Sequence, residues 1–249
     1  MTEEDERRQT IRLRLARLSG RPDQTIPTGF TTLDHALGSG GLPRGALVEL
    51  FGPSDSGKTT LALQIVAHVQ RAGMTAGWID AEHSFDPTYA AAAGVAMDQL
   101  PVAQPESAEQ AFEIARRLAA SDSLDLLVID SAAALVPNLE LAAGLGEPGP
   151  GLHSRVLSSG LRRLSAALAR TATLIVFLNQ TRVRRDASGQ EIETSAGGAS
   201  LKLHAAVRIE LSRVASTRVR FRVLKNKMGT AFGEGELRWK QGAGFAETP

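Results

Sequence analysis

Residues 52–59 contain the side chains whose types and spacing point most directly to chemistry. Their sequence, GPSDSGKT, matches the pattern G-x-x-x-x-G-K-[ST] in full, with an apolar stretch before it and a helical pattern after it. Glycines allow a loop to curl until its backbone N–H groups point inward at phosphate oxygens, and the following helix adds its positive N-terminus. We therefore predict a phosphate-binding loop, whose members are Gly52, Pro53, Ser54, Asp55, Ser56, Gly57, Lys58 and Thr59.

Two side chains of this loop and one acid further along the chain form a candidate site for metal and phosphate. Lys58 supplies a cation for the β- and γ-phosphates, and the Thr59 hydroxyl is a hard oxygen ligand that suits Mg²⁺. Asp130 ends the apolar run LLVID, at the edge of a parallel sheet where ligands bind. Considered alone, Asp130 is better explained as a cap of the next segment. Paired with this loop, it is expected to help hold Mg²⁺.

The elements that must position these residues alternate between strands and helices. Apolar runs predict strands over residues 46–51, 75–80, 124–130 and 173–179. Helical patterns cover residues 58–71, the segment after Asp86, residues 107–119 and residues 152–170. This alternation predicts an α/β fold with a mostly parallel sheet flanked by helices. After residue 205 only strands follow, at 206–211, 218–224 and 236–239, and they predict an antiparallel C-terminal extension.

Two long segments, residues 137–151 and 181–198, show no clear pattern. We expect them to be functional or mobile loops, because loops of this length are uncommon inside a compact domain. The pattern of residues 1–18 predicts a short helix, and residues 19–23 form a linker after it. The predicted organisation is therefore an N-terminal helix and linker over residues 1–23, and one core domain over residues 24–249.

Composition narrows the class of protein. A chain of 249 residues with 43% hydrophobic residues can bury a real core, and the absence of cysteine excludes disulfide scaffolds and Cys-ligated metal sites. We find no run of about 18 apolar residues that could span a membrane, and the N-terminus is charged where a signal peptide is apolar. We therefore expect a protein of the reducing cytoplasm with no membrane partner.

The net charge of +1 conceals a strong asymmetry. Residues 155–227 hold 15 basic and 4 acidic residues, whereas the rest of the chain holds 13 basic and 23 acidic residues. Charge divided in this way is typical of a polyanion-binding protein. Arginines spread evenly over the surface are the alternative.

From Thr28 to about Phe245 the chain resembles the bacterial RecA recombinase family, including its shorter RecA-like relatives. The matching strings, in order, are GPSDSGKTT at 52–60, IDAEH at 79–83, DPTY at 86–89, VIDS at 128–131, LNQ at 178–180, GG at 197–198 and KNK at 225–227. The resemblance implies a RecA-like P-loop NTPase core with ATP and Mg²⁺ as cofactors, and it extends the nucleotide-binding loop to Thr60.

The resemblance also implies roles around the nucleotide. Glu82 would activate the attacking water, which suits a carboxylate beyond a strand end. Tyr89 would stack on adenine with Asp86 near the exocyclic amine, although Tyr89 alone is equally well explained as a packed aromatic. Gln180 would sense the γ-phosphate and couple it to the loop that begins at Thr181.

Two lysines are implied to act between subunits. Lys225 and Lys227 would reach a neighbour's γ-phosphate, much as an arginine finger does. ATP would then lie between subunits, and hydrolysis would need a homo-oligomer. Without the resemblance, these residues are best explained as a solvated pair on a strand.

The resemblance places contact with single-stranded DNA on the two long loops and on the helix after the first. The implied residues are Arg155, Ser158, Arg162, Arg182, Arg184, Arg185, Gly197 and Gly198. Cations contact phosphates without reading sequence, so binding should weaken steeply with salt.

Two functions are compatible with these residues. The first is a Mg²⁺- and ATP-dependent, single-strand-binding ATPase of DNA repair and recombination in the damage response, including a minimal recombinase. The second is an ImuA-like adaptor for error-prone DNA synthesis that binds a polymerase, a clamp or RecA itself and turns over ATP weakly. Pro150, Arg185 and Gly189 stand where the family has bulky loop residues, Leu203 replaces an aromatic, and the family's C-terminal domain is not expected here. These departures are the features that favour the adaptor.

Overall fold

The computed structural model describes residues 24–143, 151–185, 191–195, 199–240, 242 and 244–247. The predicted N-terminal helix, and with it the proposed boundary at residue 23, lies outside the described residues. Within these ranges, no helix combines the length and the apolar character that crossing a lipid bilayer requires.

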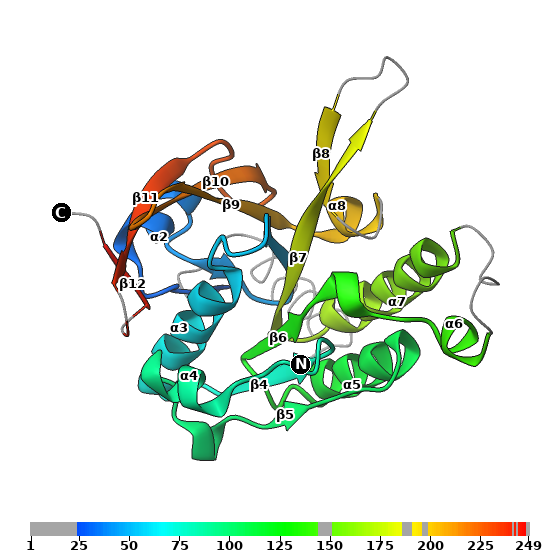
Figure 1. Cartoon of the computed structure of the whole chain (residues 1–249). Helices are drawn as coiled ribbons and strands as arrows, with labels where there is room; N and C mark the ends of the chain where they lie inside the picture. Colours follow the sequence, from blue (N-terminus) through cyan, green and yellow to red (C-terminus); the bar gives the residue numbers. More distant parts are fainter. Residues whose placement is uncertain are drawn as a thin grey trace, which may run out of the picture.

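A mixed sheet forms the centre of the fold (Figure 1). Its strand order is β12-β11-β10-β9-β3-β7-β6-β4-β5. The strands are β3 (Leu47–Gly52), β4 (Ala76–Asp80), β5 (Val102–Ala103), β6 (Leu126–Asp130), β7 (Leu174–Arg185), β9 (Val207–Ala215), β10 (Arg218–Asn226), β11 (Glu234–Lys240) and β12 (Gly244–Glu247). Strands β9, β3, β7, β6, β4 and β5 are parallel to one another, and β10 to β12 add antiparallel pairs. The predicted fold class, including the antiparallel extension, is confirmed.

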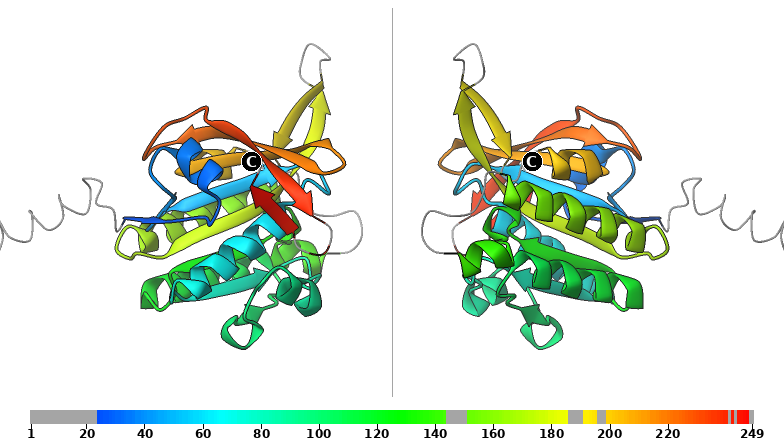
Figure 2. Two further views of the ribbon diagram at one scale, coloured as in Figure 1. Left: turned by 90° about the vertical axis from the view of Figure 1, so that its left-hand side faces the viewer. Right: turned by 90° about the vertical axis from the view of Figure 1, so that its right-hand side faces the viewer.

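Helices cover both faces of the sheet and give three layers (Figures 1 and 2). The helices are α2 (Thr31–Leu37), α3 (Lys58–Arg71), α4 (Pro87–Ala92), α5 (Ala108–Ser121), α6 (Asn138–Ala142), α7 (Leu152–Leu168) and α8 (Ser200–His204), with 3-10 turns at Met97–Gln99 and Ala132–Ala134. One core contains Leu61 and Ile65 of α3, and the other contains Leu157 and Leu161 of α7. A short pair, β1 (Thr25–Ile26) with β2 (Leu42–Pro43), lies outside the main sheet.

The structure differs from the sequence prediction chiefly after residue 180. The segment 181–198 was expected to be a loop, yet β7 continues to Arg185 and pairs antiparallel with β8 (Glu191–Ser195). The resulting hairpin projects beyond the carboxyl edge of the sheet (Figures 1 and 2). Backbone pairing across the hairpin supplies the hydrogen bonds, so the strands form without the apolar alternation that marks a half-buried strand.

A buried polar cluster joins three strands in the middle of the sheet. Glu49 of β3 is fully buried, and its two carboxylate oxygens accept hydrogen bonds from Asn179 Nδ2 of β7 (2.9 Å) and Arg208 Nε of β9 (2.5 Å). The Arg208 guanidinium also lies over the ring of Phe51, 4.4 Å from its centroid. Because a buried charge is costly without partners, this cluster depends on all of its members.

Replacing Glu49 tests that dependence. Glu49→Ala leaves the Arg208 cation without its carboxylate, so we expect a loss of about 3–5 kcal/mol of unfolding free energy. Urea denaturation followed by circular dichroism measures it. The control is Glu234→Ala at an exposed position, which should change stability by less than about 0.5 kcal/mol. Equal effects of the two variants would show that the cluster contributes nothing specific.

Candidate nucleotide site

The loop predicted to bind phosphate connects β3 to α3 at the carboxyl edge of the parallel strands. Gly57 adopts a left-handed conformation (φ 89°) immediately before α3, and a Cβ there would come within 2.4 Å of the Phe245 ring. A Cβ on Gly52 would lie 2.1 Å from the Leu211 carbonyl oxygen. Both positions therefore require glycine, and the loop takes the tight course that the sequence pattern predicts.

The Lys58 ammonium is held inside the curl of this loop. The side chain is 9% exposed, and Nζ donates to the carbonyl oxygens of Pro53 (2.7 Å) and Gly52 (3.2 Å). Burial lowers the pKa of Lys58, while the carboxylates of Asp130, Glu82 and Asp55 oppose that shift. A buried cation beside loop amides at a helix N-terminus provides the charge that a phosphate group needs.

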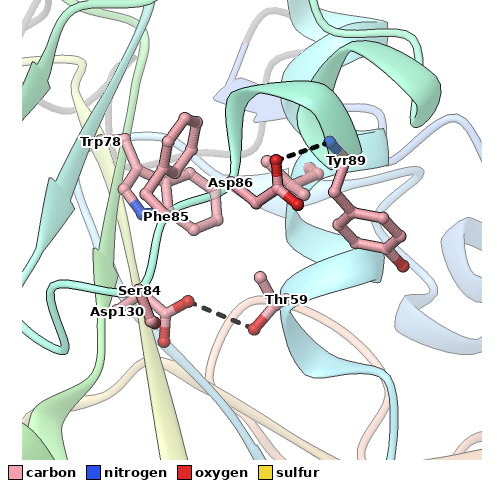
Figure 3. Close-up of a pocket in the computed structure, with 8 residues that line it drawn as sticks. Thr59, Trp78, Ser84, Phe85, Asp86, Tyr89 and Asp130 are labelled. Atoms are coloured by element: carbon pink, nitrogen blue, oxygen red, sulfur yellow. Dashed lines mark hydrogen bonds between the residues drawn. The ribbon is translucent and has the colours of Figure 1, made fainter.

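Thr59 and Asp130 meet as the sequence predicts for a magnesium site. The Thr59 hydroxyl donates to Asp130 Oδ2 at 3.2 Å (Figure 3). Burial raises the pKa of Asp130 to about 7, and the nearby Glu82 carboxylate adds to the increase. The residues that the structure describes contain no cluster of three or more His, Asp or Glu side chains arranged around a metal position. One hydroxyl and one carboxylate suit Mg²⁺, which keeps several waters and takes phosphate oxygens as further ligands.

A second group of polar side chains surrounds the predicted catalytic acid. Glu82 Oε1 accepts hydrogen bonds from Ser131 Oγ (2.5 Å) and from Gln180 Nε2 (3.4 Å). The structure thus brings Glu82, Gln180 and Asp130 together from three neighbouring strands. The contact of Ser131 was not predicted, although the residue lies inside the string VIDS that carries the resemblance.

The predicted adenine contacts lie beside α3. Tyr89 is 37% exposed, and its hydroxyl lies 2.5 Å from Thr60 Oγ1. Asp86 caps α4 by accepting the N–H groups of Thr88 (2.8 Å) and Tyr89 (3.2 Å) through Oδ1.

A pocket of about 180 Å³ opens next to these side chains (Figure 3). Its lining consists of Thr59, Leu63, Trp78, Ser84, Phe85, Asp86, Tyr89 and Asp130. Trp78 and Phe85 were not singled out from the sequence. Their position between the strings KTT and DPTY is the only signal that could have drawn attention to them.

The predicted intersubunit lysines do not reach this site within the chain. In the sheet register, Lys225 of β10 lies opposite Arg208 of β9, and Arg208 lies opposite Glu49 near the middle of β3. The backbone N–H of Lys227 donates to the Ala206 carbonyl oxygen, which lies nearer the amino edge of the sheet. The Lys225 ammonium donates to the carbonyl oxygens of Lys202 (2.6 Å) and Leu203 (3.2 Å) at the end of α8. Their role toward a neighbour's phosphate stays a prediction, which needs a second chain.

The predicted DNA contacts fall into two groups. Arg155, Ser158 and Arg162 lie on α7 at spacings of three and four, which places them on one helix face, and both arginines are exposed. Arg182, Arg184 and Arg185 belong to the projecting β7, but their side chains lie outside the described residues. Gly197 and Gly198 also lie outside them.

Comparison with known proteins gives one consistent family. The model of the RecA N-terminal domain matches residues 9–246. A Protein RecA of Chloroflexus aurantiacus is 46% identical over 223 residues, which are 86% of this chain and 64% of that protein. Those of Leifsonia xyli subsp. xyli and Bifidobacterium longum are 45% and 44% identical, covering 94% and 92% of this chain and 68% and 61% of their own lengths.

The chain therefore belongs to the RecA N-terminal domain family, as the resemblance predicted. It spans somewhat less than two thirds of the Chloroflexus relative, so what that whole protein does is not carried over by the match alone.

The raised pKa of Asp130 gives a testable dependence of stability on pH. Between its ordinary value of 3.8 and about pH 7, the folded protein without nucleotide or metal binds a proton that the unfolded chain has released. The stability due to this group is therefore greatest at low pH and falls as the pH rises towards 7. Asp130→Asn cannot titrate, so its stability relative to the wild type should increase by up to about 1.4 kcal/mol per pH unit between pH 5 and 7.

Urea denaturation at several pH values, without Mg²⁺, measures this difference. The exposed Asp98→Asn removes one carboxylate elsewhere on the surface and serves as the control. A pH-independent difference for Asp130→Asn would contradict the raised pKa.

Proposed function

We propose that the chain is a Mg²⁺- and ATP-dependent, single-stranded-DNA-binding ATPase of DNA repair and recombination. The observation that supports this most strongly is the assembly of Lys58, Thr59, Asp130 and Glu82 at one sheet edge. Bound there, Mg²⁺ would neutralise charge on the β- and γ-phosphates. The cysteine-free composition favours action in the cytoplasm.

In this proposal each side chain has a separate task. Lys58 would leave the loop carbonyls and place its ammonium against phosphate oxygens. Glu82 would take the proton of the attacking water on its carboxylate, which the hydrogen bond from Ser131 keeps oriented. Gln180 contacts Glu82 and begins the polar end of β7, so it would connect the state of the nucleotide with the hairpin.

DNA binding is proposed for two sets of arginines, those of α7 and those of the β7–β8 hairpin. Exposed arginines of α7 and the arginines of β7 would contact phosphates, which gives binding without sequence preference. Because Lys225 and Lys227 lie away from the phosphate loop of their own chain, their proposed role requires a homo-oligomer. The family match and the RecA relatives give no specific support to the adaptor function or to a polymerase partner.

Glu82→Gln separates binding from turnover. The variant keeps the size of the side chain but cannot accept the proton, so we expect unchanged ATP affinity and turnover reduced by about 10²–10⁴-fold. Calorimetric titration with ATP and a phosphate-release assay with single-stranded DNA measure the two quantities. Lys58→Ala is the matched comparison, because it should lose ATP affinity itself. Normal turnover of Glu82→Gln would exclude Glu82 as the base.

The hairpin arginines are tested through salt. Replacing Arg182, Arg184 and Arg185 by Ala removes three phosphate contacts, so the slope of log affinity against log salt should flatten by about 2. Fluorescence anisotropy with labelled oligo-dT at several salt concentrations measures the slope. A control with Arg116, Arg117 and Arg170 replaced removes the same charge away from the hairpin and should leave the slope unchanged. Equal slopes for both triple variants would move the DNA site elsewhere.

A further inference from the structure

A continuous set of hydrogen bonds leads from the buried cluster around Glu49 to the predicted catalytic acid. Glu49 and Asn179 are both fully buried, and Asn179 Nδ2 donates to Glu49 Oε1 at 2.9 Å. The other end of the same amide, Asn179 Oδ1, accepts the backbone N–H of Gln180 at 2.9 Å. The Gln180 side chain then donates through Nε2 to Glu82 Oε1 at 3.4 Å. One side-chain amide therefore lies between a buried carboxylate and the residue that contacts the predicted base.

The chemistry of its two partners fixes the direction of the Asn179 amide. A carboxylate accepts hydrogen bonds, whereas a backbone N–H donates them. The amide meets both requirements in one orientation, with Nδ2 toward Glu49 and Oδ1 toward the N–H of Gln180. The reverse orientation would place acceptor against acceptor and donor against donor in the interior, where each mismatch is costly.

Gln180 lies where the pairing of β7 changes. The register with β6 ends at Phe177, the register with β3 continues to Gln180, and the register with β8 begins at Thr181. A hydrogen bond from the Gln180 N–H to a buried side chain restrains the rotation φ of that residue. Because the Cα–Cβ bond turns with φ, the Asn179 amide sets the direction in which the Gln180 side chain leaves the strand.

We infer that Glu49 and Asn179 are positioning residues for the proposed ATPase reaction: the buried carboxylate orients the Asn179 amide, and that amide holds Gln180 toward Glu82. The inference rests on the proposed function, because it concerns turnover of ATP at the phosphate loop. Both residues act through Gln180, so their effect on turnover should vanish when the Gln180 side chain is removed.

The charge of Glu49 also acts on the strand that carries the proposed intersubunit lysines. Arg208, whose Nε donates to Glu49 Oε2 at 2.5 Å, lies opposite Lys225 in the register of β9 with β10. Burial lowers the pKa of Lys225, Lys227 and Arg208 add to the decrease, and the Glu49 carboxylate opposes it. A test of the Asn179 amide must therefore separate its effect from a change of charge near Lys225.

Exchanging the carboxylate and the amide tests the orientation. In Glu49→Gln, the new carbonyl oxygen faces Arg208 and the new NH₂ group faces Asn179, so the Asn179 amide must turn and present Nδ2 to the Gln180 N–H. We expect turnover to fall about 10- to 100-fold with unchanged ATP affinity. The exchanged pair, Glu49→Gln with Asn179→Asp, restores a donor against an acceptor at every contact and keeps the net charge. Its turnover should return to within about 3-fold of the wild type.

Calorimetric titration with ATP and a phosphate-release assay with single-stranded DNA measure affinity and turnover. In a Gln180→Ala background, Glu49→Gln should cause no further loss of turnover, whereas an effect through the charge near Lys225 would persist. Leu174→Ala is the control for stability, because Leu174 is fully buried at the opposite end of β7 and its truncation weakens the fold without changing the amide. An equal loss of turnover in Leu174→Ala would show that destabilisation alone explains the effect, and would overturn the inference.

The remaining outcomes are distinct. If the wild type neither binds nor hydrolyses ATP, the proposed function itself fails. If the wild type turns over ATP, the inference is wrong when Glu49→Gln is as fast, when the exchanged pair stays as slow as Glu49→Gln, or when Glu49→Gln slows the Gln180→Ala variant further. Hydrogen exchange followed by NMR decides the matter on the wild type even if the variants fold poorly. The Gln180 amide should be protected like that of Phe177, and exchange at the rate of an exposed amide would overturn the inference.

Discussion

The site depends on keeping one ammonium group and several carboxylates close together in a poorly solvated space. Burial lowers the pKa of Lys58 and raises that of Asp130, so each group resists the charge that phosphate or metal binding would demand of it. The loop carbonyls of Gly52 and Pro53 partly satisfy the ammonium in the meantime. Triphosphate and Mg²⁺ together would neutralise both groups, because one adds negative charge beside the lysine and the other positive charge beside the carboxylate. Under the proposed function, the electrostatics of these buried groups would therefore favour joint binding of triphosphate and Mg²⁺.

Much of the fold could be predicted because buried strands and helices have apolar runs or apolar repeats in their sequences. The predicted helix 58–71 has the same bounds as α3, and the buried strands β3 and β6 were found from their apolar runs. The extension of β7 was missed, because residues 181–185 are mostly polar and lack the apolar alternation that marks a half-buried strand. The short elements α2 and β5 were also missed. A helix of fewer than two turns and a strand of fewer than three residues are too short to show a hydrophobic repeat.

The candidate site was predictable to a different extent for each residue. Lys58 and Thr59 follow from a motif whose spacing is fixed by the chemistry of phosphate binding, and Asp130 follows from its place at the end of an apolar run. The contact between Ser131 and Glu82 could not be predicted from the sequence, because it joins the ends of two strands that are distant along the chain. The hydrogen bond between Asn179 and Glu49 could not be predicted either, since it depends on the pairing of β3 with β7.

The cluster around Glu49 has a further consequence for how the molecule can move. Its hydrogen bonds to Asn179 and Arg208 tie β3 to both adjoining strands, and the Asn179 side chain also accepts the N–H of Gln180. If one of these strands slid past its neighbour, a buried charge would lose its hydrogen-bond partner. We therefore expect the three strands to move as one rigid unit. Under the proposed function, movement coupled to the nucleotide would therefore occur outside these central strands or between whole molecules.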